Sequence, residues 1–165
     1  MLQTVAIASV VALTFLAAPV RLESSAPPSS WVGIVADHAF TFYVPPGSDL
    51  KLLPGRPIDS FARRYAGATF RLAFDYGRWS NKLSDFVGDP RYRSTSALID
   101  GRRALIVTGP GLGQWDCHDD LAAVYVIDHA EGRQPIALEM DACTRDPRQL
   151  ETVQAIFRTI KFTSR

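Results

Sequence analysis

Alternating apolar and polar side chains predict two strands in the first half of the chain. Residues 40–44 alternate as Phe-Thr-Phe-Tyr-Val, and the run stops at Pro45 because proline has no N–H to donate to a strand ladder. Residues 70–76 alternate more regularly, with Phe, Leu, Phe and Tyr separated by Arg, Ala and Asp, and Gly77 follows. This second run predicts a strand with one buried face.

The stretch between these strands is rich in glycine and proline over residues 47–58, which predicts a loop. Asp59 or Ser60 then stands where a helix N-cap is expected. Phe61 and Tyr65 lie four residues apart, as they would on one face of a helix. The sequence therefore allows one short extra helix after this loop.

An Asp-Gly pair marks the first of two predicted β-hairpins. Residues 93–99 and 102–108 are strand-like runs that flank Asp100 and Gly101, and both of these residues tolerate the positive φ of a tight turn. The polar stretch before this hairpin, residues 78–90, predicts a loop.

The second predicted hairpin joins residues 121–128 to residues 134–141 through a short turn that contains a glycine. The first of these strands, like residues 102–108, is apolar at consecutive positions, so we expect it to be central and covered on both faces. Glu139 and Asp141 place charge on one face of the other strand. That charge predicts a position near the edge of the sheet.

The last element that the pattern predicts is an amphipathic helix. Asp146 is a favourable N-cap, Pro147 suits the first helical position, and Gln149 stands three residues after the cap, as in a capping box. Apolar side chains then recur along one face, and residues 160–162 indicate a short extended end. The apolar face comprises Leu150, Val153, Phe157 and Ile160.

About six strands joined mainly by hairpins, followed by one amphipathic helix, predict an α+β fold with an antiparallel sheet. We expect a single α+β domain over residues 31–165, after a flexible lead at residues 27–30. One domain agrees with the size of the chain, because 165 residues are enough for one sizeable core but not for two.

The N-terminal segment predicts a signal peptide over residues 1–26. Residues 1–20 carry no charged side chain, and the apolar run from Val5 to Val20 is shorter than the roughly 20 residues that a membrane-spanning helix needs. The region before this run lacks Lys and Arg, so an uncleaved N-terminal anchor stays open as the alternative. We expect an exported protein, periplasmic or secreted, with no stable membrane span after cleavage.

Composition and charge narrow the range of partners. Apolar residues make up 47% of the chain and charged residues 21%, which is ordinary for a globular domain. The formal net charge is only +1. A protein that binds nucleic acid electrostatically carries a strong basic excess, so this charge argues against a nucleic-acid partner.

Cys117 and Cys143 are the two cysteines of the chain. A cysteine pair in an exported protein is expected to form a disulfide. The second predicted hairpin supports this pairing, because folding the chain about residues 130–131 places both cysteines at its open end. Free reactive thiols or metal-binding thiols are the alternative.

Three features follow one another along residues 31–163. An aromatic strand ends in Pro-Pro-Gly at 45–47, a hairpin sheet follows, and a C-terminal helix runs into residues 158–162. In this order the chain resembles the Mog1/PsbP-like α/β sandwich, and it is similar to exported bacterial proteins with stretches like residues 58–60 and 75–81. Members of that fold bind proteins or serve as accessory subunits. The resemblance therefore implies a fold and a possible protein partner in the cell envelope.

The densest polar cluster covers residues 115–120, Trp-Asp-Cys-His-Asp-Asp. Carboxylates and imidazole are ligand types for a divalent cation, and His118, Asp119 and Asp120 are the candidate ligands. The spacing matches no established metal site, and the alternative is a solvated loop beside a disulfide. We expect no cofactor.

A second cluster, residues 75–81, leaves the predicted strand as a loop that joins acidic, aromatic, basic and amide groups. Loops of this kind often carry function, which predicts a recognition loop. The alternative is that the aromatic side chains pack at the edge of the core while the polar ones fix the turn. The candidate recognition residues are Asp75, Tyr76, Trp79, Ser80 and Asn81.

Sequence motifs of the common hydrolases and zinc enzymes do not occur in the chain: there is no Gly-x-Ser-x-Gly and no His-Glu-x-x-His. Gly109, Gly111 and Gly113 fail the dinucleotide-binding pattern and predict a flexible loop. We therefore expect a non-catalytic exported domain that binds a protein or supports an envelope assembly. A small-molecule or metal-binding domain is the first alternative, and an unrecognised hydrolase is the second.

Overall fold

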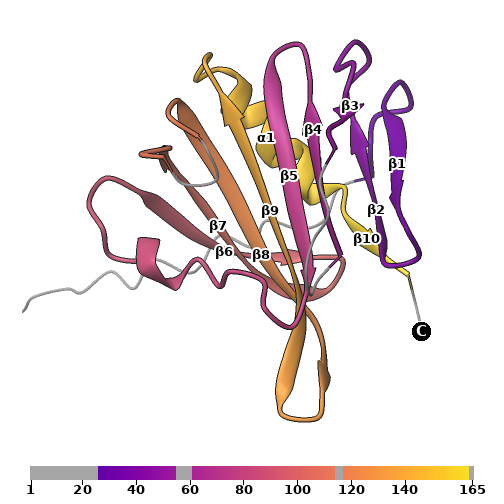
Figure 1. Ribbon diagram of the computed structural model, residues 1–165, viewed down its shortest axis with the longest axis vertical. Coiled ribbons are helices and arrows are strands. Elements are labelled where there is room, and N and C mark those ends of the chain that lie inside the picture. The colour runs from indigo at the N-terminus through magenta and orange to yellow at the C-terminus, as the bar shows by residue number, and fades with distance from the viewer. Residues whose placement is uncertain (1–25, 55–60, 114–116, 164–165) are drawn as a thin grey trace, which may run out of the picture.

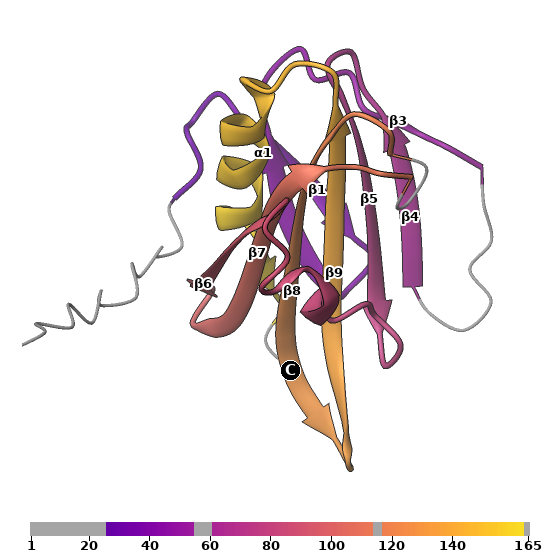
Figure 2. The ribbon, with the colours of Figure 1, turned by 90° about the vertical axis from the view of Figure 1, so that its left-hand side faces the viewer.

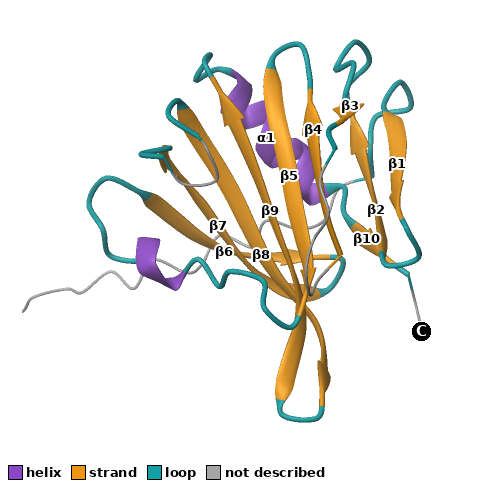
Figure 3. Ribbon diagram, viewed as in Figure 1, coloured by secondary structure: helices purple, strands orange, loops and turns teal. Residues whose placement is uncertain are grey.

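The protein folds into two antiparallel sheets and one α-helix (Figure 1, Figure 3). A computed structural model describes residues 26–54, 61–113 and 117–163. Strands dominate this part of the chain, and the helix lies near its C-terminal end. The antiparallel sheet architecture with a C-terminal helix is confirmed, although the strands form two sheets rather than one sheet of about six strands.

The large sheet contains seven strands, which are hydrogen-bonded in the order β3-β4-β5-β9-β8-β7-β6. A 3-10 helix, Ser84–Phe86, lies in the segment that leads from β5 to β6. In chain order the strands are β3 (Lys51–Leu52), β4 (Phe61–Ala66), β5 (Phe70–Gly77), β6 (Arg93–Ile99), β7 (Arg102–Pro110), β8 (Asp120–Glu131) and β9 (Gln134–Thr144).

The small sheet joins the two ends of the described chain. It contains β1 (Val32–Ala36), β2 (Phe40–Val44) and β10 (Lys161–Phe162), with β2 in the middle. β10 follows the helix α1 (Gln149–Arg158), so the end of the chain returns to pair with the first hairpin.

The main core lies between the large sheet and a layer made of α1 and the small sheet. Figure 2 shows this layer on one side of the large sheet, which we call the inner face. Aromatic rings fill the space, and Phe40 of β2 packs edge-on against Phe74 of β5 with ring centroids 5.0 Å apart. The helix contributes its buried stripe, which comprises Val153, Ile156 and Phe157.

The opposite face of the large sheet, which we call the outer face, carries a second apolar cluster. Leu83, Phe86 and Tyr92 come from the segment between β5 and β6 and pack in this cluster with Val107 of β7 and Leu121 of β8. β8 is therefore covered on both faces and lies inside the sheet, between β7 and β9, as its apolar sequence predicts.

Phe61 and Tyr65 lie on a strand rather than on the short extra helix that their spacing allows. They belong to β4, which pairs along its whole length with β5. A spacing of four residues returns a side chain to the same face of a strand as well as of a helix. Both rings face the core, with centroids 5.4 and 6.3 Å from that of Phe74. Asp59 and Ser60, the expected caps, lie outside the described residues.

β9 is central in the sheet, which corrects the prediction that residues 134–141 lie near an edge. Its neighbours are β5 on one side and β8 on the other. Glu139 and Asp141 are only 3% and 5% exposed. The prediction is wrong because these carboxyl groups are buried on the outer face instead of marking a solvent-exposed one.

The C-terminal helix is confirmed, but it begins at Gln149, later than the predicted cap implies. Asp146 instead accepts the N–H of Arg148 through Oδ1 at 3.1 Å and the N–H of Gln149 through its carbonyl oxygen at 2.8 Å. The N–H of Asp146 donates to the hydroxyl of Thr144 at 3.2 Å. The Thr144 hydroxyl thus accepts the backbone N–H of Asp146, which the Gln149 side chain would accept in a capping box.

Two further features complete the fold. The β8–β9 hairpin extends beyond the other strands (Figure 1) and turns at Gly132, which has a φ of 63°. Within the described part of the chain, no helix combines the length and the apolar character that crossing a membrane requires.

Candidate functional site

Three carboxyl groups meet on the outer face of the large sheet. Asp75 of β5 is the direct cross-strand partner of Glu139 on β9. Asp141 lies two residues further along β9 and therefore points to the same face. We call Asp75, Glu139 and Asp141 the carboxyl cluster.

Glu139 is almost fully buried, and its surroundings disfavour its charged form. Its Oε1 has no hydrogen-bond partner among the described residues, and neither has Oδ1 of Asp75. Burial raises the pKa of Glu139 well above its ordinary range, and the neighbouring carboxylates of Asp141 and Asp75 raise it further. Both effects favour the neutral form of the side chain over the charged one.

Asp141 is also buried, but two guanidinium groups lie near it. Burial raises the pKa of Asp141 to about 7, while Arg64 and Arg71 act in the opposite direction. A cavity of about 160 Å³ lies beside Asp141, with Arg64, Arg71 and Cys143 among its lining residues. This part of the cluster combines fixed cations with a carboxyl group that titrates near neutral pH.

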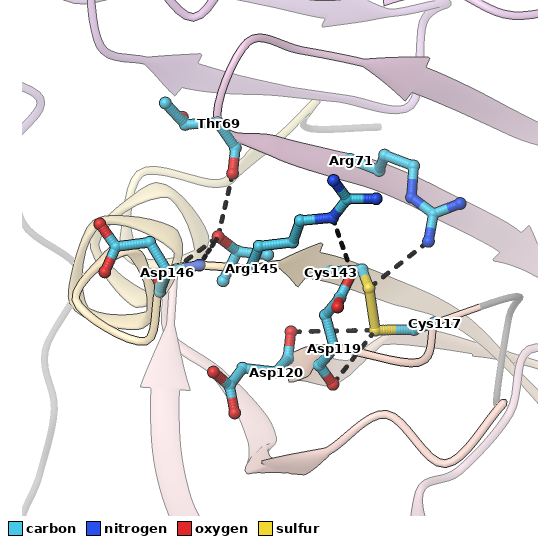
Figure 4. The surroundings of a disulfide bond; sticks show 9 residues. Thr69, Arg71, Cys117, Asp119, Asp120, Cys143, Arg145 and Asp146 are labelled. Carbon is cyan, nitrogen blue, oxygen red and sulfur yellow. Dashed lines mark hydrogen bonds and ion pairs between the residues drawn. A yellow bond between two sulfur atoms is a disulfide. The ribbon is translucent and has the colours of Figure 1, made fainter.

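A disulfide joins Cys117 and Cys143 (Figure 4). Cys143 lines the same cavity as Asp141 of the carboxyl cluster. The two Cα atoms are 5.6 Å apart, within the usual range for a disulfide. Nη2 of Arg71 lies 3.6 Å from Sγ of Cys143. The carbonyl oxygens of Asp119 and Asp120 lie 3.7 and 3.8 Å from Sγ of Cys117. The predicted disulfide is confirmed.

The route by which the two cysteines meet differs from the predicted one. In the β8–β9 ladder Cys143 pairs with Leu121, not with a position near Cys117. The turn lies at residues 132–133, later than the expected residues 130–131. Cys117 precedes β8 in a loop that folds back, where the N–H of Gly111 donates to the carbonyl of Asp119 at 2.7 Å.

Glycines allow this loop to pack closely against the disulfide. A Cβ on Gly111 would lie 2.6 Å from Sγ of Cys117, and a Cβ on Gly109 would lie 2.9 Å from the carbonyl oxygen of Arg91. Gly113 has a φ of 87°, and its N–H donates to the carbonyl of Cys117 at 2.7 Å. Close packing therefore requires glycine at positions 109 and 111. Gly109 lies in β7, and Gly111 and Gly113 lie in the loop that follows it.

A hollow of about 680 Å³ opens beside the disulfide, between the turn from β4 to β5 and the end of β9. Arg71, His118, Asp119 and Arg145 are among its lining residues. Nε of Arg145 lies 3.7 Å from Oδ2 of Asp119, which is a loose ion pair between exposed groups. The hollow thus presents charged groups of both signs to solvent.

The candidate metal ligands separate into two places. His118 and Asp119 line the hollow, whereas Asp120 begins β8 and pairs with Thr144. Across residues 26–54, 61–113 and 117–163, no group of three His, Cys, Asp or Glu side chains is arranged to hold a metal ion. Residues 115–116 of the same polar cluster lie outside the described residues.

The polar residues of the predicted recognition loop hold it to the sheet. Ser80 is buried, and its hydroxyl lies 3.1 Å from the carbonyl oxygen of Asp75 and 2.9 Å from that of Ala137. Oδ1 of Asn81 accepts the N–H of Leu83 at 3.1 Å. These bonds join the loop to both β5 and β9 and fix its turn.

The two aromatic residues of this loop have different environments. Tyr76 is 8% exposed and faces the core, where its hydroxyl donates to Oδ2 of Asp128 at 2.6 Å. Trp79 is 68% exposed. Arg78 beside it forms an ion pair with Glu131 at 2.9 Å, which links the loop to the β8–β9 hairpin. Trp79 is therefore the loop residue best placed to contact another molecule.

Asp128 is the centre of a hydrogen-bond network that the sequence does not reveal. Besides the hydrogen bond from the hydroxyl of Tyr76, its Oδ1 accepts one from the Nε–H of Arg102 at 2.7 Å. Its Oδ2 also lies 2.8 Å from Nδ1 of His129. Burial raises the pKa of Asp128, but the bonds from these three partners outweigh it and hold the pKa below its ordinary value. A β-bulge between Ile127 and His129 places the residue, and alternation cannot predict a bulge.

Comparison with known proteins assigns no relative to this chain. No protein-family model matches it, and no curated protein sequence matches it either.

Proposed function

We propose that the chain is an exported, non-catalytic domain that binds a protein partner of the cell envelope through Trp79 and its neighbours. The observation that carries this proposal is the 68% exposure of Trp79 on a loop that Ser80 fastens to β5 and β9. Tryptophan is enriched among the residues that dominate the binding energy of protein interfaces. A fastened loop also loses little conformational entropy when a partner binds.

Neighbouring side chains extend the surface around Trp79. Arg78 and Glu131 form their ion pair with about half of each side chain exposed, at 50% and 58%. Ile127 is 42% exposed and lies on the same end of the outer face, because its ladder partner on β9 also pairs with the last residue of β5. We call Trp79, Arg78, Glu131 and Ile127 the Trp79 surface. An apolar centre with a polar rim is the usual anatomy of a protein interface.

Export is part of the proposal. The disulfide is compatible with an oxidising compartment, and residues 1–26 have the apolar run of a signal peptide. The resemblance to the Mog1/PsbP-like sandwich agrees with a protein-binding role and stays a prediction. Part of the pattern behind it, residues 58–60, lies outside the described residues.

Small-molecule binding is the second candidate, and the hollow beside the disulfide favours it. The guanidinium groups of Arg71 and Arg145 and the imidazole of His118 line this hollow. Such groups suit a small anion that carries a carboxylate or a phosphate. Its volume of about 680 Å³ lies in the range of small-molecule sites.

Truncation of Trp79 tests the first proposal. We expect Trp79→Ala to weaken binding to the partner by at least about tenfold, since hot-spot truncations cost roughly 2 kcal/mol or more. Unfolding by urea should stay close to that of the wild type, because the side chain is exposed. The partner is captured from a cross-linked envelope fraction, purified, and titrated against each variant by calorimetry.

Val35→Ala is the matched control, because Val35 is 70% exposed on β1, in the small sheet. It should bind the partner as the wild type does. The proposal fails if Trp79→Ala binds the purified partner as tightly as both of these proteins do. The second candidate is favoured if Arg71→Gln loses the binding of a small carboxylate or phosphate anion while Trp79→Ala keeps it.

A further inference from the structure

We propose that the carboxyl cluster is a proton-binding site, in which Asp75, Glu139 and Asp141 together retain at least one proton near neutral pH and thereby stabilise the outer face. This role is independent of the Trp79 surface, and it holds whether or not that surface binds a partner.

The pairing of β5 with β9 forces two of the carboxyl groups together. Asp75 and Glu139 are direct cross-strand partners, and in such pairs the Cβ atoms lie roughly 4.5–5.5 Å apart. Like charges in this position destabilise a sheet even at its surface. Here Glu139 is 3% exposed, so keeping both groups charged costs still more. A proton on one of them removes the repulsion.

The unpartnered oxygens of the pair support the same conclusion. Oε1 of Glu139 and Oδ1 of Asp75 are both buried, and neither has a hydrogen-bond partner in the described part of the chain. Burying a charged oxygen without a partner is costly. A protonated carboxyl group can donate a hydrogen bond, which a carboxylate cannot. A proton on one of the two groups therefore removes the cost of burying a second unpartnered charge.

The charged groups that surround the cluster do not balance three carboxylates. Among the described residues, β4 contributes Arg64 and β5 contributes Arg71, and both act on Asp141. On the other side of β9 the uncharged Tyr125 stands opposite the buried glutamate. Tyr92 lies in the segment between β5 and β6 that covers the outer face, which we call the covering segment, and it belongs to the same apolar cluster as Tyr125. Two guanidinium groups thus face three carboxyl groups, and a proton supplies the missing positive charge.

Loss of this proton acts on the segment that covers the outer face. The carbonyl of Asp75 is one of the acceptors of the Ser80 hydroxyl, so the start of the covering segment is hydrogen-bonded to a member of the carboxyl pair. Repulsion between Asp75 and Glu139 in their ionised forms pushes β5 and β9 apart at this point. We therefore expect deprotonation to destabilise the folded protein.

A titration of the wild-type protein measures the site directly. Side-chain carboxyl ¹³C shifts are followed by NMR between pH 3 and 9. We expect the resonances of Glu139 and Asp141 to move above pH 6, because burial raises both pKa values. Titration of both Glu139 and Asp141 below pH 5 overturns the proposal.

The pH dependence of unfolding gives the second measurement. A carboxyl group whose pKa is raised by folding stabilises the protein at low pH, and this stability is lost as the pH rises toward the folded pKa. For one such proton the unfolding constant rises about tenfold per pH unit. Glu139 and Asp141 both contribute to this rise in the wild type between pH 5 and 7. In Glu139→Gln we expect the unfolding constant to rise less steeply, by about a factor of ten less per pH unit.

Asp75→Asn tests the same proton from the other side of the pair and serves if Glu139→Gln does not fold. Glu151→Gln makes the matched change on an exposed residue of α1 and should follow the wild type. Equal pH slopes in the wild type, Glu139→Gln and Asp75→Asn overturn the proposal.

Discussion

Gly111 illustrates how the absence of one side chain shapes the outer face. Its N–H donates to the carbonyl of Asp119, and its Cα lies against Cys117. Any Cβ at this position would overlap both the backbone and the sulfur atom of Cys117. Cys117 is fully buried and held by the disulfide, so it has no room to move aside.

We predict that Gly111→Ala lowers the free energy of unfolding by about 1–3 kcal/mol, the usual cost of overpacking a close contact. The measurement is urea unfolding under non-reducing conditions. Gly132→Asn is the control, because Gly132 has a φ of 63°, which asparagine tolerates, and a Cβ there meets nothing within 4 Å. An alanine variant as stable as the wild type would show that the loop can shift away from the disulfide.

Residue types alone predict some of the candidate site and mislead about the rest. Two cysteines together with an apolar N-terminal run of the signal-peptide type are enough to predict the disulfide, because an oxidising compartment leaves few alternatives. Glu139 misleads because a carboxylate ordinarily marks an exposed position. Asp128 gives no signal of its role, because Tyr76 and Arg102 reach it only when β5, β7 and β8 are assembled in the sheet.

Among the elements, the β8–β9 hairpin depends most on a covalent link. The disulfide spans a sequence separation of 26 residues and holds the loop before β8 to the end of β9. On the chain-entropy model a closed loop of this length stabilises the folded state by about 3–4 kcal/mol. The same bond closes one side of the outer-face apolar cluster, to which both cysteines belong.

We predict that the double variant Cys117→Ala/Cys143→Ala loses about 3–4 kcal/mol of unfolding free energy. Guanidinium unfolding of both proteins without reductant measures the difference. Adding reductant to unfolded wild-type protein and refolding it should reproduce the loss. If the variant and the oxidised wild type unfold at the same denaturant concentration, the hairpin holds this loop without the covalent link.

Alternation along the sequence predicts which elements are strands and which face is buried, but not which strands are neighbours. The strands at 40–44 and 70–76 and the two hairpins follow from local pattern and turn residues. The pairing of β5 with β9 joins residues far apart in the chain, from Phe70 with Thr144 to Gly77 with Ala137, and no local signal encodes it. The central position of β9, and with it the carboxyl cluster, depends on that pairing.

At the scale of the whole molecule, a chain of polar contacts joins the large sheet to the small one. Asp128 accepts Nε of Arg102, and Nη1 of Arg102 donates to Oδ2 of Asp100 at 2.9 Å. Asp100 also accepts the backbone N–H of Phe162 at 3.0 Å and Nζ of Lys161 at 3.2 Å. The turn between β6 and β7 is thereby fixed to β10, and β10 to the core.

We predict that Asp128→Asn lowers the free energy of unfolding by about 1.5–3 kcal/mol at pH 7, because it removes the charged acceptor of Arg102 and Tyr76 while Arg102 keeps its contact with Asp100. The hydrogen bonds that hold the pKa of Asp128 below its ordinary value stabilise the protein above that value. This contribution disappears as the pH falls through the folded pKa. The difference between variant and wild type should therefore shrink below about pH 4.

Thermal unfolding at pH 7 and at pH 3 measures this difference. Asp89→Asn is the matched control, since Asp89 also pairs with an arginine, Arg91, at 2.6 Å, but on the exposed surface. Its effect should be much smaller than that of Asp128→Asn. If the two substitutions lower the stability equally, the Asp128 network contributes no more than an exposed ion pair, and other contacts must hold the two sheets together.

The disulfide also determines what happens to the protruding hairpin when a protease reaches it. The bond closes a ring in the chain, and the exposed turn at residues 131–134 lies within that ring. A single cut of the backbone at this turn opens the ring without dividing the molecule, because the two fragments stay joined through sulfur. Under oxidising conditions the protein can thus be nicked at this turn and remain one covalent unit.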